Sequence, residues 1–170
     1  MRHTASRTLY AHWDALRGDR QAPDRAEIEP RSLATVLADT FVLEADATGM
    51  APYRLAGSKI CALFGHEMTG LSFLAHFQGD DRETVDRALK DGGENAAIIT
   101  IAARGITEGG REVALEMIIL PLVHRGTLGA RFIGALAPFG DTFWRGRDAI
   151  VELTLEHVRL SWPDQLAAAK

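Results

Sequence analysis

Residues 96–122, AAIITIAARGITEGGREVALEMIILPL, decide the fold of this 170-residue chain. They contain two apolar runs, at 96–106 and 111–122, joined by the turn-like TEGG. In the second run, apolar residues alternate with polar or small ones that include Glu112 and Glu116, which is the two-residue period of a strand with one buried face. Two strands joined by so short a turn pair antiparallel. The stretch therefore predicts a β-hairpin, and we expect its glutamates on a solvated face.

Further strands flank this hairpin on both sides. TFVLEAD (40–46) and PYRLA (52–56), separated by the turn-like ATGM, predict an earlier hairpin. LGARFIGALAPF (128–139) and VELTLE (151–156) predict two later strands. For the last segment a helix through HVRL (157–160) is the alternative.

A helical period fills the sequence between the two hairpins. From Ser58 the apolar residues cluster as on one helix face, and Gly65 ends the segment. A better helix opens at Asp80, a residue type that caps helix N-termini, and continues to about Lys90. The glycine pair at 92–93 predicts that this helix breaks there. Helices inserted among antiparallel strands must cover one face of the sheet, which predicts an α+β domain.

The chain opens with one more helical segment, Thr8–Arg17. Leu9, Trp13 and Leu16 form an apolar stripe at helical spacing, with Tyr10 beside it. The stripe either folds back onto its own sheet or pairs with a second copy of the chain, and the sequence leaves both alternatives open. In the second case these four residues are the interface, because Trp and Tyr are enriched at interface hot spots.

Composition and charge exclude several classes of protein. The chain is 46% hydrophobic and 25% charged, which is ordinary for a globular domain. A formal charge of −4 provides no basic field for nucleic acid, and no apolar run approaches the ~20 residues that span a bilayer. One cysteine excludes an intrachain disulfide, and the start of the chain lacks an apolar signal core. We therefore expect a cytoplasmic protein that binds neither nucleic acid nor membrane.

Two stretches of the sequence carry a family resemblance. YRLAGSKICALFGHEMTGLSF (53–73) resembles the part of a PAS sensor domain where a second strand enters a helix that ends in Phe-Gly, followed by a second glycine turn. WDALRGDRQAPDRAEIEP (13–30) resembles the leader of small standalone bacterial PAS-like proteins, in which a Trp-Asp-x-Leu-Arg-Gly helix precedes a proline-containing connector. The similarity covers about residues 9 to 138, which is most of the chain.

The resemblance implies a PAS-like sheet of five or six antiparallel strands, with short helices on one face and an N-terminal helix. We expect a helical leader at 1–38, a PAS-like domain at 39–160 and a C-terminal tail at 161–170. The resemblance also implies a sensory or regulatory module that acts through protein–protein contact rather than turnover. We expect its partner to be a second copy, forming a homodimer, or an unidentified signalling protein.

The interior between the helices and the sheet is the candidate ligand site. Pockets of this kind are mostly apolar with a few polar anchors, so a small apolar ligand would suit it. The same side chains can instead fill a core at native density, and the sequence leaves both alternatives open. The candidate ligand-binding residues are Phe64, His66, Phe73, His76, Phe77, Ile99, Met117 and Phe132.

Three residues bear on chemistry in this interior. Cys61 has apolar neighbours, which favour a buried and inert thiol. In light-sensing PAS relatives the reactive cysteine lies in an Asn-Cys-Arg-Phe-Leu-Gln context on a later helix, which SKICALFG lacks. His66 and His76 are the only candidates for a haem ligand, as a PAS domain can hold haem through one histidine, or for the base of a small enzyme or carrier that uses the same cavity. No HxxxH or HExxH spacing occurs, so we expect no metal, no cofactor and no catalytic residue.

Overall fold

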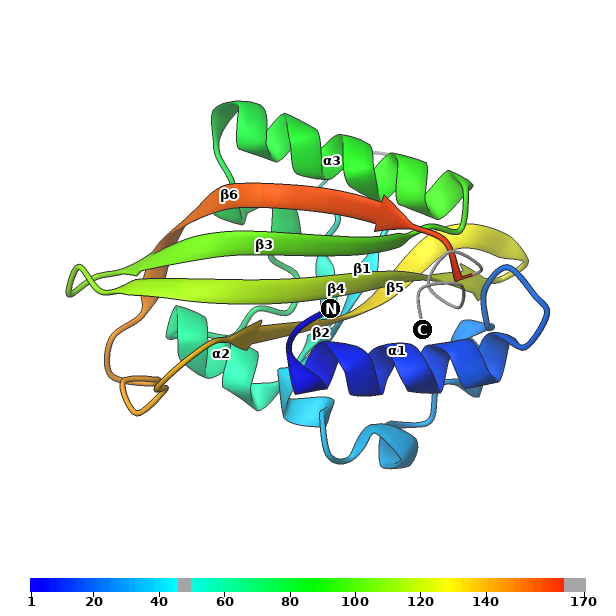
Figure 1. Ribbon diagram of the computed structural model, residues 1–170, viewed down its shortest axis with the longest axis horizontal. Coiled ribbons are helices and arrows are strands. Elements are labelled where there is room, and N and C mark those ends of the chain that lie inside the picture. The colour runs from blue at the N-terminus through cyan, green and yellow to red at the C-terminus, as the bar shows by residue number, and fades with distance from the viewer. Residues whose placement is uncertain (46–49, 164–170) are drawn as a thin grey trace.

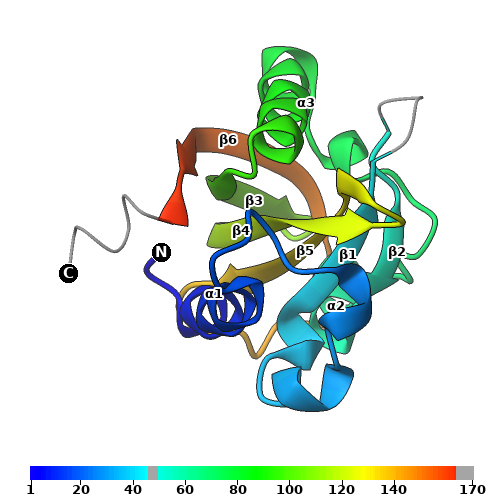
Figure 2. The same ribbon diagram turned by 90° about the vertical axis from the view of Figure 1, so that its right-hand side faces the viewer.

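The computed structural model describes residues 1–45 and 50–163. Six strands form one antiparallel sheet in the order β2-β1-β5-β4-β3-β6, which confirms the predicted fold class. The strands are β1 (Thr40–Glu44), β2 (Tyr53–Ala56), β3 (Ile98–Thr107), β4 (Glu112–His124), β5 (Thr127–Pro138) and β6 (Ile150–Ser161). The helices are α1 (Thr4–Arg17), η1 (Arg25–Glu27), η2 (Pro30–Leu33), η3 (Leu37–Asp39), α2 (Ser58–Phe64), η4 (Phe73–His76) and α3 (Gly79–Glu94). Figures 1 and 2 show the sheet between two helical layers.

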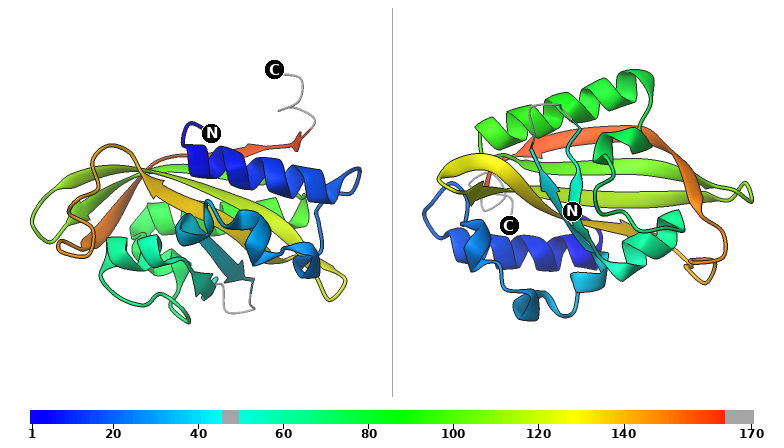
Figure 3. Two further views of the ribbon diagram at one scale, coloured as in Figure 1. Left: turned by 90° about the horizontal axis from the view of Figure 1, so that it is seen from below. Right: turned by 180° about the vertical axis from the view of Figure 1, so that it is seen from behind.

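The central strand β4 is apolar on both faces, so both faces of the sheet need a cover. Met117 and Ile119 point to one face and Ile118 and Leu120 to the other, and all four have 0% exposed surface. The inner face packs against α2, η4 and α3, and the outer face packs against α1 and the rest of the leader (Figure 3). The two clusters make two hydrophobic cores that share one sheet.

The strands predicted from sequence pair as expected, and the last strand is longer than predicted. β3 and β4 form the predicted hairpin, paired from Ile106 with Glu112 to Ile99 with Ile119, and β1 pairs with β2. The turn of that second hairpin, at residues 46–49, lies outside the described residues. β6 pairs with β3 from Ile150 to Ser161, so the last segment is a strand throughout and the helical alternative through residues 157–160 is wrong.

The glycine pair at 92–93 does not break α3, contrary to the prediction. The helix continues to Glu94, and both glycines lie on the side that faces the sheet. A Cβ atom on Gly92 would lie 2.6 Å from the side chain of Ile99, and one on Gly129 would lie 2.6 Å from Gly93 Cα. Glycine is required at 129, where φ is +70° and a Cβ would meet the helix backbone, whereas at 92 the Ile99 side chain would have to move.

Both long helices begin earlier than predicted. α1 begins at Thr4 rather than Thr8, and α3 begins one residue before Asp80. Asp81 in the first turn of α3 accepts a hydrogen bond of 2.9 Å from the backbone N–H of Leu155. This bond ties the edge strand β6 to the helix above it.

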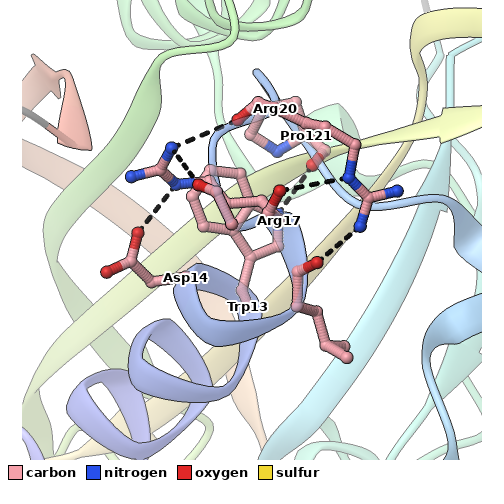
Figure 4. Close-up of polar contacts among 7 residues, drawn as sticks. Trp13, Asp14, Arg17, Arg20 and Pro121 are labelled. Atoms are coloured by element: carbon pink, nitrogen blue, oxygen red, sulfur yellow. Dashed lines mark hydrogen bonds and ion pairs between the residues drawn. The ribbon is translucent and has the colours of Figure 1, made fainter.

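The leader helix α1 folds back onto its own sheet. Leu9 and Trp13 have 0% exposed surface in the single chain. The indole N–H of Trp13 donates to the backbone carbonyl of Pro121 in β4 at 2.8 Å, and the Arg17 guanidinium lies 5.7 Å from the indole ring centroid (Figure 4). The packing of Leu9 and Trp13 is therefore that of the fold-back alternative.

Glu116 holds the start of α1, and the prediction that it lies on a solvated face is wrong. Its side chain is 5% exposed, and its carboxylate accepts hydrogen bonds from the backbone N–H groups of Arg2 at 2.7 Å and His3 at 2.9 Å. Burial raises the pKa of Glu116, but the Ser6 hydroxyl and the two N–H groups lower it by more, so the pKa lies below its usual value. The ionised carboxylate pins the N-terminus of α1 to β4, where the helix dipole favours negative charge.

Replacing Trp13 tests the fold-back packing. We expect Trp13→Ala to lower the free energy of unfolding by about 3–5 kcal/mol, the usual cost of truncating a buried large aromatic. The loss should be the same at two protein concentrations in urea denaturation, because the contact lies within one chain. Trp162→Ala, at a residue that is 40% exposed, is the control and should cost about 1 kcal/mol or less. A larger loss at low protein concentration would instead place Trp13 between two copies.

Glu116 generates a second test, through pH. Because its pKa is lowered in the folded state, its contribution to stability is complete above the usual value of 4.5 and is lost as the pH falls through the folded-state value. We expect Glu116→Gln to lower the free energy of unfolding at pH 7 by about 1.5–3 kcal/mol and to flatten the acid dependence. Glu112→Gln, at a side chain that is 64% exposed, should leave both unchanged. An unaltered acid dependence in Glu116→Gln would contradict the assignment.

Candidate functional site

An aromatic cluster fills the interior where β1 and β2 meet α2 and η4. The ring of Tyr53 lies edge-on to Phe41 and Phe73, with centroids 5.7 and 5.8 Å apart. His76 stacks on Phe64 with centroids 4.3 Å apart, and its ring lies 5.9 Å from that of Tyr53. Aromatic pairs in these geometries stabilise a core beyond the area that they bury.

Two polar atoms in this cluster have no hydrogen-bond partner among the described residues: the Tyr53 hydroxyl and Nε2 of His76. Burial lowers the pKa of His76 to about 4, and the nearby His66 acts in the same direction. Burial also raises the pKa of Tyr53, and Cys61 adds to that effect. Both side chains are therefore neutral at pH 7, and each loses its hydration without a hydrogen bond in return.

The structure separates His66 from the other predicted ligand-binding residues. Phe73, Ile99 and Met117 have 0% exposed surface, so no space as wide as a water molecule touches them. His66 is exposed just after α2, outside the buried core but near His76. The apolar residues of the set share one buried cluster: Phe64, Phe73, Phe77, Ile99, Met117 and Phe132.

Cys61 lies at the edge of the core rather than inside it. It is half-buried on α2, with Sγ 3.9 Å from the Ala56 carbonyl oxygen and 3.8 Å from Oε1 of Glu67. Both neighbours are hydrogen-bond acceptors, so the thiol S–H is directed at oxygen atoms at the edge of the core. Within residues 1–45 and 50–163, no three His, Cys, Asp or Glu side chains gather as a metal site.

An open apolar cleft of about 210 Å³ lies where the C-terminal half of α3 meets the start of β5. Gly93 and Gly129 form its floor at the point where helix and strand cross, and Phe132 forms part of its wall. At the rim, Nζ of Lys90 and the carboxylate of Asp86 form an ion pair of 2.7 Å. The full lining is Ala45, Ala51, Asp86, Leu89, Lys90, Gly93, Glu94, Leu128, Gly129 and Phe132.

Sequence reasoning identified Phe132 but missed the rest of this cleft. The cleft exists because α3 passes over β5 at two glycines, and the helix was predicted to end before that crossing. The signal that was present in the sequence was the pairing of small residues, Gly93 on the helix and Gly129 on the strand.

The leader residues predicted for an interface divide into two pairs. Leu9 and Trp13 are buried under α1, whereas Tyr10 and Leu16 are half-buried on its flanks and pack against the same outer cluster. Of these four residues, only the second pair keeps exposed surface.

The buried imidazole of His76 predicts a pH dependence of stability. As the pH falls from 6.5 to about 4, the unfolded chain takes up a proton that the folded chain does not, so stability falls by up to ~1.4 kcal/mol per pH unit. We expect His76→Phe to abolish this slope and to be equally or more stable at pH 7, because it removes an unpaired buried nitrogen. Urea denaturation at pH 7, 6 and 5 measures the slope, and His157→Gln, at an exposed position of β6, is the control. A slope that persists in His76→Phe would overturn the prediction.

Comparison with known proteins identifies a matching family and solved structures of similar fold. The family described as PAS domain matches residues 1–137. An RNA-binding Light-Oxygen-Voltage receptor aligns with a TM-score of 0.51 and 16% identity, over 68% of this chain and 35% of that one. A Light-Oxygen-Voltage domain studied with a flavin analogue aligns with a TM-score of 0.50 and 16% identity, over 65% and 84% of the two chains.

A third structure, the LOV protein of Rhodobacter sphaeroides, aligns with a TM-score of 0.48 and 12% identity, over 68% of this chain and 71% of that one. No curated protein matches the chain. At these identities the structural likeness concerns the fold alone. The family match covers most of the chain, and this protein therefore belongs to the PAS domain family.

Proposed function

We propose that this chain is a sensory or regulatory module that binds a small apolar molecule in the cleft between α3 and β5 and acts on a protein partner. The observation that carries the proposal is that the cleft is walled by the inner core itself. Phe132 and Leu89 line the cleft and also belong to the buried cluster over the sheet. A ligand there contacts the residues that hold α3 on β5.

The size and lining of the cleft define the ligand class. A cavity of 150 Å³ lined by apolar side chains accommodates benzene, so about 210 Å³ accommodates one ring with a short substituent. The lining is aliphatic and aromatic apart from its rim, which is the usual composition of a small-molecule site. Polar contacts are confined to the mouth, where Asp86, Lys90 and Glu94 lie.

One strand links the cleft to the opposite face of the sheet. Phe132 of β5 faces the cleft, and the next residue, Ile133, packs in the outer cluster with Trp13. A ligand that binds more tightly to one position of β5 shifts the population toward that position. The free energy of this shift equals the difference between the ligand's binding free energies for the two positions, and Ile133 carries the change to the outer face. The outer face is where α1 presents Tyr10 and Leu16, so we propose this surface for contact with a signalling protein or a second copy.

The rival function, an enzyme with a histidine base, has less support. A general base needs a hydrogen-bonding partner that orients it. Among the described residues, His76 Nε2 has none, and Nδ1 of His66 lies 3.1 Å from the backbone oxygen of Glu67 at the surface.

None of the helices described is long and apolar enough to cross a membrane. The proposal also places the action of this chain in the cytoplasm, as expected from sequence. It likewise takes the partner to be a protein rather than a nucleic acid.

Ethylbenzene is a suitable probe of the cleft. We expect it to shift backbone amide signals of α3 and the start of β5 in ¹H–¹⁵N NMR spectra, with saturation on titration. Leu128→Trp, which fills the cleft, should abolish the shifts. Leu55→Trp, at a residue of β2 that is 42% exposed and outside the cleft, should leave them unchanged. Shifts that survive in Leu128→Trp, or their absence in the wild type, would refute the proposal.

A further inference from the structure

A second hollow, of about 370 Å³, lies on the outer face of the sheet, between the N-terminus of α1 and strand β6. The strand register explains it. Ala102 of β3 lies between His157 of β6 and Glu116 of β4, and Thr100 lies opposite Arg159. Short side chains therefore form the floor in the middle of the sheet, while longer ones rise at both sides.

The walls of this groove differ in chemistry from those of the cleft under α3. Arg2 from the leader and Arg159 from β6 both line the groove. Thr100 and Ser161 supply hydroxyl groups, and the ring of Phe139 supplies an apolar surface. Together these groups can bind an anionic head and an organic body.

The two arginines are available, whereas the acidic residues of the groove are already bound. Within the described residues, neither Arg2 nor Arg159 forms an ion pair, and the Arg2 guanidinium lies over the Phe139 ring at 5.4 Å. The Glu116 carboxylate accepts the N–H groups at the start of α1, as described above. Glu156 is paired with Arg104 at 3.1 Å.

We propose that this groove binds a small organic anion, with a carboxylate or phosphate group held between Arg2 and Arg159. Arginine suits this role because its planar fork matches both groups in a bidentate geometry. The ligand joins the leader segment to the edge strand β6, so its binding holds the N-terminus of α1 on the sheet. This site lies on the opposite face from the cleft and does not depend on the function proposed for the cleft.

Calorimetric titration with phthalate and with phenyl phosphate tests the proposal, because the two probes share an aromatic body and differ in the anionic group. Benzamide serves as the neutral probe. We expect one or both anions to bind at a single site, benzamide not to bind, and affinity to fall as salt is raised. The stronger of the two anions identifies whether carboxylate or phosphate is preferred.

Three variants locate the binding. Arg159→Gln should weaken the anion at least tenfold. Ala114→Phe, which fills the floor at an exposed strand position and leaves the charge unchanged, should weaken it as well. Arg87→Gln makes the same change of charge at an exposed position on α3, on the other face of the sheet, and should alter the affinity less than twofold. Circular dichroism confirms that each variant is folded.

Two results would overturn the proposal. One is the absence of binding by both anions at millimolar concentration to the wild type. The other is equal weakening by Arg159→Gln and Arg87→Gln, which would mean that the anions respond only to the charge of the whole surface.

Discussion

Burial of the central strands on both faces is the constraint on which the rest of this structure depends. β4 and β5 carry apolar side chains above and below the sheet, so an uncovered face would expose a large hydrophobic area. The helices α2 and α3 cover one face, and α1 covers the other. Trp13 is the largest fully buried side chain on the second face, and its indole N–H donates to the carbonyl of Pro121.

The buried carboxylate of Glu116 holds α1 in place on this face. An isolated carboxylate under a helix is costly unless hydrogen bonds compensate it. Glu116 meets this requirement with the N–H groups of Arg2 and His3, which are free at the start of α1. The same arrangement places Arg2 at the wall of the outer groove. The anchoring of the leader and the proposed anion site therefore share one set of residues, whereas the apolar cleft on the inner face rests on the crossing of Gly93 and Gly129.

The sequence predicted the elements whose signals are local. The alternation at 111–122, the short turn before it and the strand-forming run at 151–156 each specified a strand, and the turn lengths specified antiparallel pairing. The stripe of Leu9 and Trp13 specified an amphipathic helix. The apolar residues proposed for the interior also share one cluster, because a two-residue period assigns each side chain to a face of the sheet.

By itself, then, the sequence determined the α+β class, the order of the elements and the composition of the inner core. Only the tertiary structure decided what depends on contacts between distant segments. Gly92 and Gly93 signal a break in isolation, yet they belong to the helix because α3 crosses β3 and β5 there. Glu116 has the pattern of a solvated strand residue, yet it is buried because α1 begins above it. In both cases the contacting segment lies far away in the sequence. A hydrophobic period within one segment carries no information about such a contact.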